Sequence, residues 1–220
     1  MKVELQKQLF DKYPKIFGDH TKPMTQTCMY WGLEIEDGWY DIIDTLCNAL
    51  TYTYSTSTNL NEEDGKRLGI APYTFQDEKT VYSYEVPVPQ LVADQVKEKF
   101  GTLRFYYHLE LDSTTKELLQ LSDKFSEDFT QTECSCYRRE LQPKKKYPEL
   151  ESIIERYYNY ISGMVHYAET ASSLTCEVTG KRGVLHTSGG WLKVLNEEFA
   201  KTTPEYSNYE LYNETKNKVQ

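Results

Sequence analysis

The sequence contains no apolar run that approaches the roughly 20 residues a helix needs to cross a membrane. Its first residues, Met1-Lys2-Val3-Glu4-Leu5, lead into a charged amphipathic stretch instead of the apolar centre of a secretory signal. The five cysteines are odd in number and irregularly spaced: Cys28, Cys47, Cys134, Cys136 and Cys176. Reduced thiols are therefore expected, and they predict a soluble, cytoplasmic protein.

Complete catalytic motifs are also missing. The four histidines are scattered at His20, His108, His166 and His186, without the spacing of a zinc protease, a deaminase or a two-histidine phosphodiesterase. Ser188-Gly189-Gly190 lacks the strand, glycine-rich loop and helix context of a P-loop and also its Lys-Ser/Thr ending. We predict no catalytic residue, no cofactor and no bound metal, and we expect a structural role for most of the histidines.

Positive charge is scarce, because the formal net charge of the chain is −9. Nonspecific binding to nucleic acid needs a cationic face, so nucleic acid is not an expected partner. Tyrosine is abundant instead, with 19 residues. Tyrosine has an apolar ring and a polar tip, which suits wet pockets and interfaces, but half-buried packing in a polar-surfaced protein explains the same abundance.

The segment 92–107 organises our prediction of the fold. Val92, Val96 and Phe100 recur every four residues, which predicts one apolar side of a helix, with Gly101 as its C-terminal cap. A strand is expected next. Its inward residues would be Leu103, Phe105 and Tyr107, and its outward residues Arg104, Tyr106 and His108.

Other segments carry clearer periodicities. Helical spacing predicts helices near residues 5–13, 39–50, 118–125, 153–171 and 191–200, and alternation predicts strands near residues 29–35 and 81–88. In the first strand, Trp31, Leu33 and Ile35 would share the buried face. Asp37 is available as the N-cap of the helix from Trp39. The polar stretch 51–69 is expected to end in a surface loop.

These elements predict an α+β fold. A small antiparallel sheet would carry the Trp31 and Leu103 strands, packed by helices from Trp39, Pro89 and Ile153. We expect a single globular domain over 1–220, with a helical insertion at 111–151. Its tip, with basic residues Arg138, Arg139 and Lys144 to Lys146, would be mobile, and the polar tail 203–220 would fray.

Several ordered blocks resemble a family of tailed-bacteriophage proteins. The blocks are Tyr13-Pro14-Lys15-Ile16-Phe17, Trp31-Gly32-Leu33-Glu34, Asp37-Gly38-Trp39-Tyr40-Asp41-Ile42-Ile43-Asp44 and Gln95-Val96-Lys97-Glu98-Lys99-Phe100-Gly101-Thr102-Leu103-Arg104-Phe105-Tyr106. The resemblance continues at Ala168-Glu169, Thr175-Cys176-Glu177, Gly180, Gly183 and Trp191. It covers about half of the chain and brings no activity with it. It implies a protein of the cytoplasm of an infected bacterial host.

Many members of that family carry a Cys-x-x-Cys knuckle after the long helix and further cysteines in the last helix, which makes a zinc site. This chain keeps Cys176 but has Thr179, Leu195 and Glu198 where other thiols are expected. Cys176 and His186 would supply at most two ligands, so we predict that zinc is lost. Apolar packing around Val184, Leu185, Trp191 and Leu195 would hold this corner instead.

A basic and aromatic set is the leading candidate for a binding site. Lys97, Lys99 and Arg104, beside Tyr106 and His108, would pair with a small anion. A solvated helix face remains the alternative, because the lysines alternate with acidic residues.

Two tryptophans and a further arginine complete the candidate set. A nucleobase would stack on Trp31, Tyr106 or Trp191, and a phosphate would pair with Arg182. The alternative for the Arg182 and Trp191 region is a loop left from the zinc knuckle.

An acidic set is the competing candidate. It comprises Glu34, Glu36, Asp37, Asp41 and Asp44, which would hold a divalent ion for phosphodiester hydrolysis. Helix capping and surface solvation explain the same residues, and their spacing matches no known metal motif.

We therefore expect a phage-encoded binding protein that counters host antiviral defence by sequestering a small anionic, nucleotide-derived signalling ligand. One alternative is a metal-dependent nucleotide phosphodiesterase or nuclease that uses the acidic set. Another is a direct protein–protein inhibitor of a host defence factor, with an acidic, tyrosine-rich surface.

Overall fold

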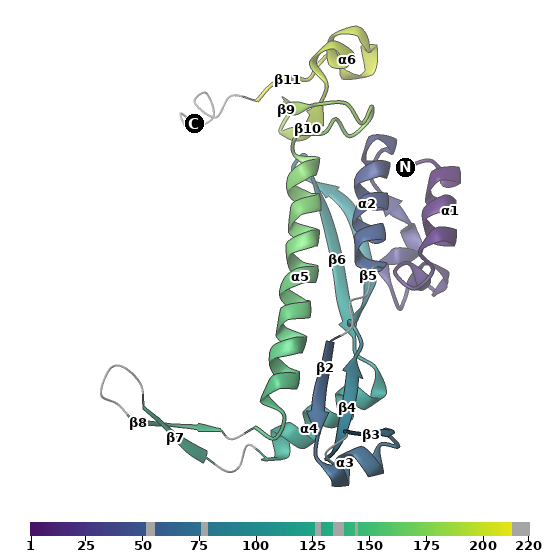
Figure 1. Ribbon diagram of the computed structural model, residues 1–220. Coiled ribbons are helices and arrows are strands. Elements are labelled where there is room, and N and C mark those ends of the chain that lie inside the picture. Colours follow the sequence, from purple (N-terminus) through teal and green to yellow (C-terminus); the bar gives the residue numbers. More distant parts are fainter. Residues whose placement is uncertain (52–55, 76–78, 126–128, 134–138, 144, 213–220) are drawn as a thin grey trace. The chain divides into compact units, whose positions relative to one another are not determined.

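The computed structural model describes residues 1–51, 56–75, 79–125, 129–133, 139–143 and 145–212 (Figure 1). It has an α+β fold, as predicted. The chain divides into two compact units. The first comprises residues 1–52, 90–109 and 161–220, and the second residues 53–89 and 110–160. The segment predicted as an insertion therefore groups with residues 53–89, which precede the central strands.

The helices of the first unit follow the sequence pattern closely. They are α1 (Val3–Lys12), α2 (Tyr40–Thr51), the part of α5 (Pro148–Ser172) that begins at Ile161, and the short α6 (Glu197–Thr202). Helix α1 lies beside α2 (Figure 1), and the Tyr13 hydroxyl donates to the backbone oxygen of Asp44 at 3.0 Å. The predictions of α1, α2 and α5 are confirmed.

A three-stranded sheet forms the centre of the first unit. Its order is β1 (Leu33–Glu34), β5 (Gln90–Lys99) and β6 (Thr102–Glu110). Strand β1 pairs with β5 in parallel, with Leu33 opposite Val96. The two-residue connection between β5 and β6 makes that pair an antiparallel hairpin. The sheet is therefore mixed, where a purely antiparallel sheet was expected.

The predicted helix from Pro89 to Phe100 is wrong, because this segment is strand β5. Phe100 and Gly101 both have positive φ, at 57° and 76°, which is the backbone of a tight hairpin turn and not of a helix cap. Val92 and Val96 are buried as expected, but Phe100 is exposed. β-branched residues also favour a strand once a partner strand is available.

The strand predicted over residues 29–35 is mostly wrong. Residues Cys28–Trp31 form a 3₁₀ turn, which the Thr27 hydroxyl caps by accepting from the Met29 N–H at 3.0 Å. Only Leu33 and Glu34 pair as a strand. The turn leaves Trp31 exposed, whereas Leu33 and Ile35 are buried as predicted.

Helix α5 covers the free edge of β6. The Leu103 N–H donates to the Ser172 hydroxyl at 2.8 Å, and the Phe105 N–H donates to the Glu169 carboxylate at 3.0 Å. Both side chains lie in the last turns of α5. Two outward donors near the start of the edge strand are therefore occupied by side chains, which hinders pairing with another chain there.

A second small sheet follows α5. Its order is β10 (Trp191–Leu195), β9 (Val184–Ser188) and β11 (Glu210–Leu211), and both pairs are antiparallel. Gly189 and Gly190, both at positive φ, make the turn between β9 and β10. The helix predicted from Trp191 is therefore wrong. A helix begins only after Asn196, whose side chain accepts from the Phe199 N–H at 3.1 Å.

The predicted fraying tail is partly ordered. Residues Pro204–Tyr206 form a 3₁₀ turn, and β11 pairs with β9. Residues 213–220 lie outside the described chain.

The second unit combines a sheet with helices and a separate hairpin. Its sheet has the order β2 (Thr56–Leu60), β4 (Thr80–Val86), β3 (Pro72–Thr74), and its helices are α3 (Glu62–Arg67), α4 (Ser113–Phe125) and the part of α5 up to Tyr160. Strands β7 (Phe129–Glu133) and β8 (Arg139–Pro143) pair with each other. The strand predicted near 81–88 and the helix near 118–125 are confirmed. The stretch 51–69 is not a loop at its end, because Asn61 caps α3 there.

One apolar core joins the two segments of the second unit. Leu60, Tyr82 and Val86 from the sheet pack with Leu118 of α4 and Leu150 of α5. The predicted insertion thus shares its core with strands β2 and β4. Residues 134–138 and Lys144 of the predicted basic tip lie outside the described chain.

No helix in the described part of the chain is both long enough and apolar enough to cross a membrane.

Candidate functional site

The predicted basic and aromatic residues of β5 and β6 form an open sheet face. Leu103 and Phe105 are buried on one side, and Arg104 and Tyr106 alternate with them on the other. The Lys97 ammonium lies 5.5 Å from the centroid of the Tyr106 ring. The Arg104 guanidinium donates to the Thr102 hydroxyl at 2.6 Å and to the Leu103 backbone oxygen at 2.8 Å.

Acidic and neutral side chains share this face. Glu34 lies opposite Lys97 in the β1–β5 register and accepts from the Gln95 amide at 3.0 Å. His108 lies 2.8 Å from the Asp94 carboxylate. Lys99 lies over the exposed Phe100 ring, at 5.3 Å from its centroid. The face therefore mixes both signs of charge.

The remaining predicted ligand residues lie elsewhere in the first unit. Trp31 packs edge-to-face on Tyr30, with ring centroids 5.3 Å apart. Trp191 is paired with Ser188 at the turn of the β9–β10 hairpin, whereas Arg182 precedes its open end, where Val184 pairs with Leu195. Four strand residues span about 13 Å, so Trp191 and Arg182 do not form one wall.

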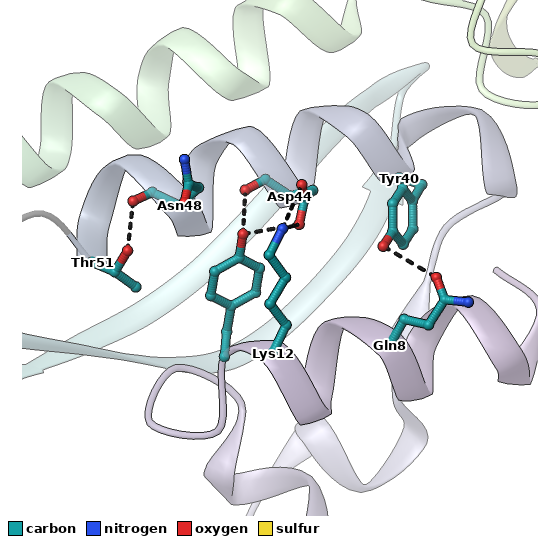
Figure 2. Close-up of polar contacts among 7 residues, drawn as sticks. Gln8, Lys12, Tyr40, Asp44, Asn48 and Thr51 are labelled. Atoms are coloured by element: carbon teal, nitrogen blue, oxygen red, sulfur yellow. Dashed lines mark hydrogen bonds and ion pairs between the residues drawn. The ribbon is translucent and has the colours of Figure 1, made fainter.

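The acidic set is divided among separate ion pairs. Asp37 accepts from the Lys2 N–H at 2.7 Å and pairs with its ammonium at 2.9 Å, so it does not cap α2. Asp44 pairs with Lys12 at 2.7 Å, as Figure 2 shows. Hydrogen bonds and charge from Lys2 lower the pKa of Asp37. Basic partners therefore already satisfy two of the five predicted metal ligands.

Glu34, Glu36 and Asp41, the other acidic residues of this set, are exposed. Among the residues that the structure describes, no three His, Cys, Asp or Glu side chains are grouped so that they would hold a metal ion.

The turn after α5 is anchored on the segment that precedes α2. The Gly38 N–H donates to the Glu177 backbone oxygen at 2.7 Å, and a Cβ on Gly38 would lie 2.4 Å from the Cys176 oxygen. Gly180, at a φ of 70°, closes the turn by donating to the Cys176 oxygen at 2.9 Å. The Trp39 indole donates to the Thr175 oxygen at 2.9 Å.

Apolar side chains fill the corner where thiols were expected. Cys176 and Leu195 are fully buried with Ala200 and Tyr206, and Phe199 packs against them. Packing around Leu195 is thus confirmed, but Trp191 is 76% exposed and does not take part in the buried cluster.

A buried ion pair lies next to this corner. The Glu177 carboxylate, 2% exposed, contacts the Lys193 ammonium at 2.9 Å. Burial raises the pKa of Glu177, and repulsion from Glu98 and Glu36 adds to the rise, against the attraction of Lys193. The Lys193 pKa is also raised, because the contact with Glu177 outweighs the effect of burial.

An open groove lies between α2 and the last turns of α5. Its volume is about 310 Å³. The lining residues are Gly38, Asp41, Ile42, Thr45, Leu46, Met164, Tyr167, Ala168, Ala171, Thr175 and Gly180. The size is within the range of small-ligand and side-chain pockets.

The groove has an apolar body and one carboxylate. Ile42, Leu46 and Met164 line it together with small alanines, and the Tyr167 ring is 69% exposed. Asp41, in the first turn of α2, has no hydrogen bond or ion pair within the described residues. The groove therefore suits an apolar group that carries a hydrogen-bond donor or a positive charge.

The groove was not predicted from the sequence. Met164, Ala168 and Ala171 lie within the helix predicted over residues 153–171, and in the structure they line the α5 side of the groove. The sequence signal for a groove was the large Tyr167 next to the small Ala168. The same pair is also compatible with a closed core contact, and only the position of α2 in the folded chain shows that the space is open.

Neither a protein-family model, nor a curated protein, nor a solved structure matches the chain. The resemblance to tailed-bacteriophage proteins therefore stays a prediction.

Proposed function

We propose that this protein works by binding a partner protein in the groove between α2 and α5. The observation that carries the proposal is the groove of about 310 Å³, in which Asp41 is the one carboxylate among the described lining residues and has no partner within the described chain. An unpaired carboxylate beside apolar side chains gives a binding group both affinity and orientation.

The lining chemistry indicates the kind of segment that binds. Apolar residues on two antiparallel helices leave room for one or two apolar side chains of a third segment, as in helix-in-groove recognition. A lysine or arginine of that segment would reach Asp41. The net charge of −9 would also attract a basic partner at a distance.

The resemblance to tailed-bacteriophage proteins supplies the biological setting. In that setting the partner is a host antiviral defence factor, and the protein acts as its direct inhibitor. Inhibition by occupation of a partner's surface needs no bond to be made or broken, so the groove alone is sufficient.

Site-specific crosslinking tests the proposal. Tyr167 is replaced by a photo-reactive phenylalanine analogue, and the matched control carries the same analogue at Tyr158, an exposed α5 residue of the second unit. We expect one host protein to be crosslinked from position 167 but not from 158, and to be lost when Asp41→Lys is added. Equal crosslinking from both positions, or no effect of Asp41→Lys, would contradict the proposal.

Sequestration of a small nucleotide-derived anion is the second candidate, and a specific observation favours it. Arg104 has no carboxylate partner among the described residues, and Lys97 and Tyr106 lie beside each other on the same sheet face. A phosphate would take the free guanidinium donors, and a base would stack on Tyr106. The open face and the nearby Glu34 make this candidate weaker than the groove.

Thermal unfolding with a panel of cyclic di- and trinucleotides, cyclic ADP-ribose isomers and NAD tests this candidate. A ligand at a hundredfold its dissociation constant adds about 2.7 kcal/mol to the free energy of unfolding. We expect the shift to vanish in Arg104→Ala and to persist in Arg156→Ala, an exposed arginine of the second unit. A panel without any shift excludes this candidate and leaves the groove proposal intact.

A further inference from the structure

The groove between α2 and α5 has two different ends, because the two helices run antiparallel. The Gly38 N–H, just before α2, donates to the Glu177 backbone oxygen in the turn after α5 at 2.7 Å. The start of α2 therefore lies beside the end of α5. Gly38 and Gly180 both line this end of the groove, whereas Met164 lines the α5 wall farther from it.

The carboxylate and the apolar surface are separated along the groove. Asp41 lies in the first turn of α2, beside the end that the turn at 176–180 borders. Ala171 lies at the same end of the α5 wall, and Met164 lies seven residues before it, which is about 10.5 Å along the helix. The groove is therefore about 10 Å long, with Asp41 at one end and Met164 at the other.

A helix fits this length and these walls. The small side chains of Ala168 and Ala171 let a third helix approach the α5 wall closely, at the separation of about 8–10 Å that is usual between packed helix axes. Residues four and seven positions along a helix lie on one face, about 6 and 10.5 Å from the first residue. Counted from the Asp41 end, these two positions reach the levels of Ala168 and Met164.

The direction of the bound helix follows from the way side chains lean. Each Cα–Cβ bond of a helix tilts towards its N-terminus, so Asp41 leans towards the end that Gly38 and Gly180 line. A basic side chain of the bound helix leans the same way only if that helix also begins at this end, parallel to α2. The positive end of its helix dipole then also lies near Asp41, whereas the opposite direction would bring the negative end to the carboxylate.

We propose that the groove binds a partner helix in which a lysine or arginine is followed four and seven residues later by large apolar residues. The basic side chain pairs with Asp41, and the two apolar side chains pack on Ala168 and Met164. No basic side chain in the described part of the chain pairs with Asp41, so its charge is available to the partner. This inference rests on the proposed function and adds the order and spacing of the residues that the partner must carry.

NMR titration of the ¹⁵N-labelled full chain tests the proposal with three synthetic helical peptides of the same composition. The first peptide has a lysine followed by leucines four and seven residues later, in a background of alanine and glutamine. The second has the reversed sequence, and the third has the two leucines moved to the opposite helix face. We expect the first peptide to shift the Thr45 and Ala168 amide resonances in a saturable manner and to bind at least tenfold more tightly than the other two.

Two variants of exposed acidic residues test the contact with Asp41. Asp41→Asn should weaken binding of the first peptide at least tenfold. Glu4→Gln, in the first turn of α1 and outside the groove lining, is the matched control and should leave binding unchanged. The inference is overturned if no peptide shifts these resonances at about 1 mM, if the reversed peptide binds as tightly as the first, or if Asp41→Asn has no effect.

Crosslinking from position 167 judges the proposed function separately. A host protein that is crosslinked there and lost on Asp41→Lys supports the proposed function, and the peptide results then decide only the order and spacing. If no host protein is crosslinked, the proposed function fails whichever peptide binds.

Discussion

Each unit of this protein buries one carboxylate against a lysine, and the two carboxylates respond to burial in opposite ways. Asp64 of the second unit is 3% exposed, and Glu177 of the first unit is 2% exposed. Burial alone raises the pKa of both. Yet the pKa of Asp64 lies below its usual value and that of Glu177 lies above it.

The difference lies in the number of donors. Asp64 contacts the Lys146 ammonium at 2.7 Å, accepts the Tyr147 hydroxyl and lies 3.5 Å from Arg67. Within the described residues, the Glu177 carboxylate has Lys193 as its single ion-pair partner, and the carboxylates of Glu98 and Glu36 act against its charge. A buried acid stays readily ionised only where the donors around it replace most of the water it has lost.

Removing the better-paired carboxylate should have the largest effect. Asp64→Ala leaves the Lys146 charge and the Tyr147 hydroxyl without their shared acceptor. We expect the free energy of unfolding to fall by about 3–5 kcal/mol, measured by urea denaturation. Glu62→Ala, which removes an exposed ion pair with Lys66 in the same helix, is the matched control and should change stability little. Similar effects of the two substitutions would contradict this account.

A smaller loss of unfolding free energy is expected from a substitution at Gly38, where the turn at 176–180 contacts the start of α2. A Cβ at residue 38 would lie 2.4 Å from the Cys176 oxygen, so Gly38→Ala forces the turn at 176–180 away from the start of α2. Overpacking of this kind costs about 1–3 kcal/mol. Gly18→Ala, with open space around its position, is the control and should unfold like the unsubstituted protein. Hydrogen exchange should show the loss first at the Gly38 and Gly180 amides.

The pH dependence of stability should separate the two carboxylates. The pKa of Glu177 is raised in the folded state, so its contribution to stability is most favourable at low pH and declines as pH rises above the unfolded value of 4.5. The pKa of Asp64 is lowered, so its contribution is present above 3.8 and is lost as pH falls further.

Two isosteric substitutions test how each carboxylate changes the unfolding free energy with pH. Glu177→Gln should flatten the decline of unfolding free energy above pH 4.5, and Asp64→Asn should remove part of the acid destabilisation below pH 4. The comparison fails if Glu177→Gln leaves the slope above pH 4.5 unchanged.

The smallest effect on stability is expected in the groove. Asp41 is exposed and has no partner in the described structure, so Asp41→Asn should leave the unfolding temperature unchanged. The same substitution should weaken binding of the crosslinked partner. A loss of stability in Asp41→Asn would show that the carboxylate supports the fold instead.

The sequence predicted those elements whose pattern is local. Helices α1, α2, α4 and α5 follow from apolar spacing, and β4 follows from alternation. The α+β fold was predicted correctly for the same reason. The segments 92–100 and 191–195 were assigned to helices because their apolar spacing also suits a helix, while their strand partners lie far away in sequence or across a turn of positive φ.

The candidate site shows the same limit. The alternation of Arg104 and Tyr106 with buried residues was predicted from the sequence, and it holds. The division of the acidic set was not predicted, because Lys2, just before α1, reaches Asp37 only in the folded chain. Lys12, in the last turn of α1, likewise reaches Asp44 only there (Figure 2). The groove was not predicted either, because it exists between two helices that are far apart in sequence.

By itself, the sequence determined the helices with a continuous apolar stripe, the inward and outward residues of β6 and the lack of a second thiol beside Cys176. Only the tertiary structure decided which strands pair, which charges neutralise each other and where the helices leave space. The physical reason is range: periodicity and turn preferences act over a few residues, whereas pairing, desolvation and cavities depend on segments that meet only after folding.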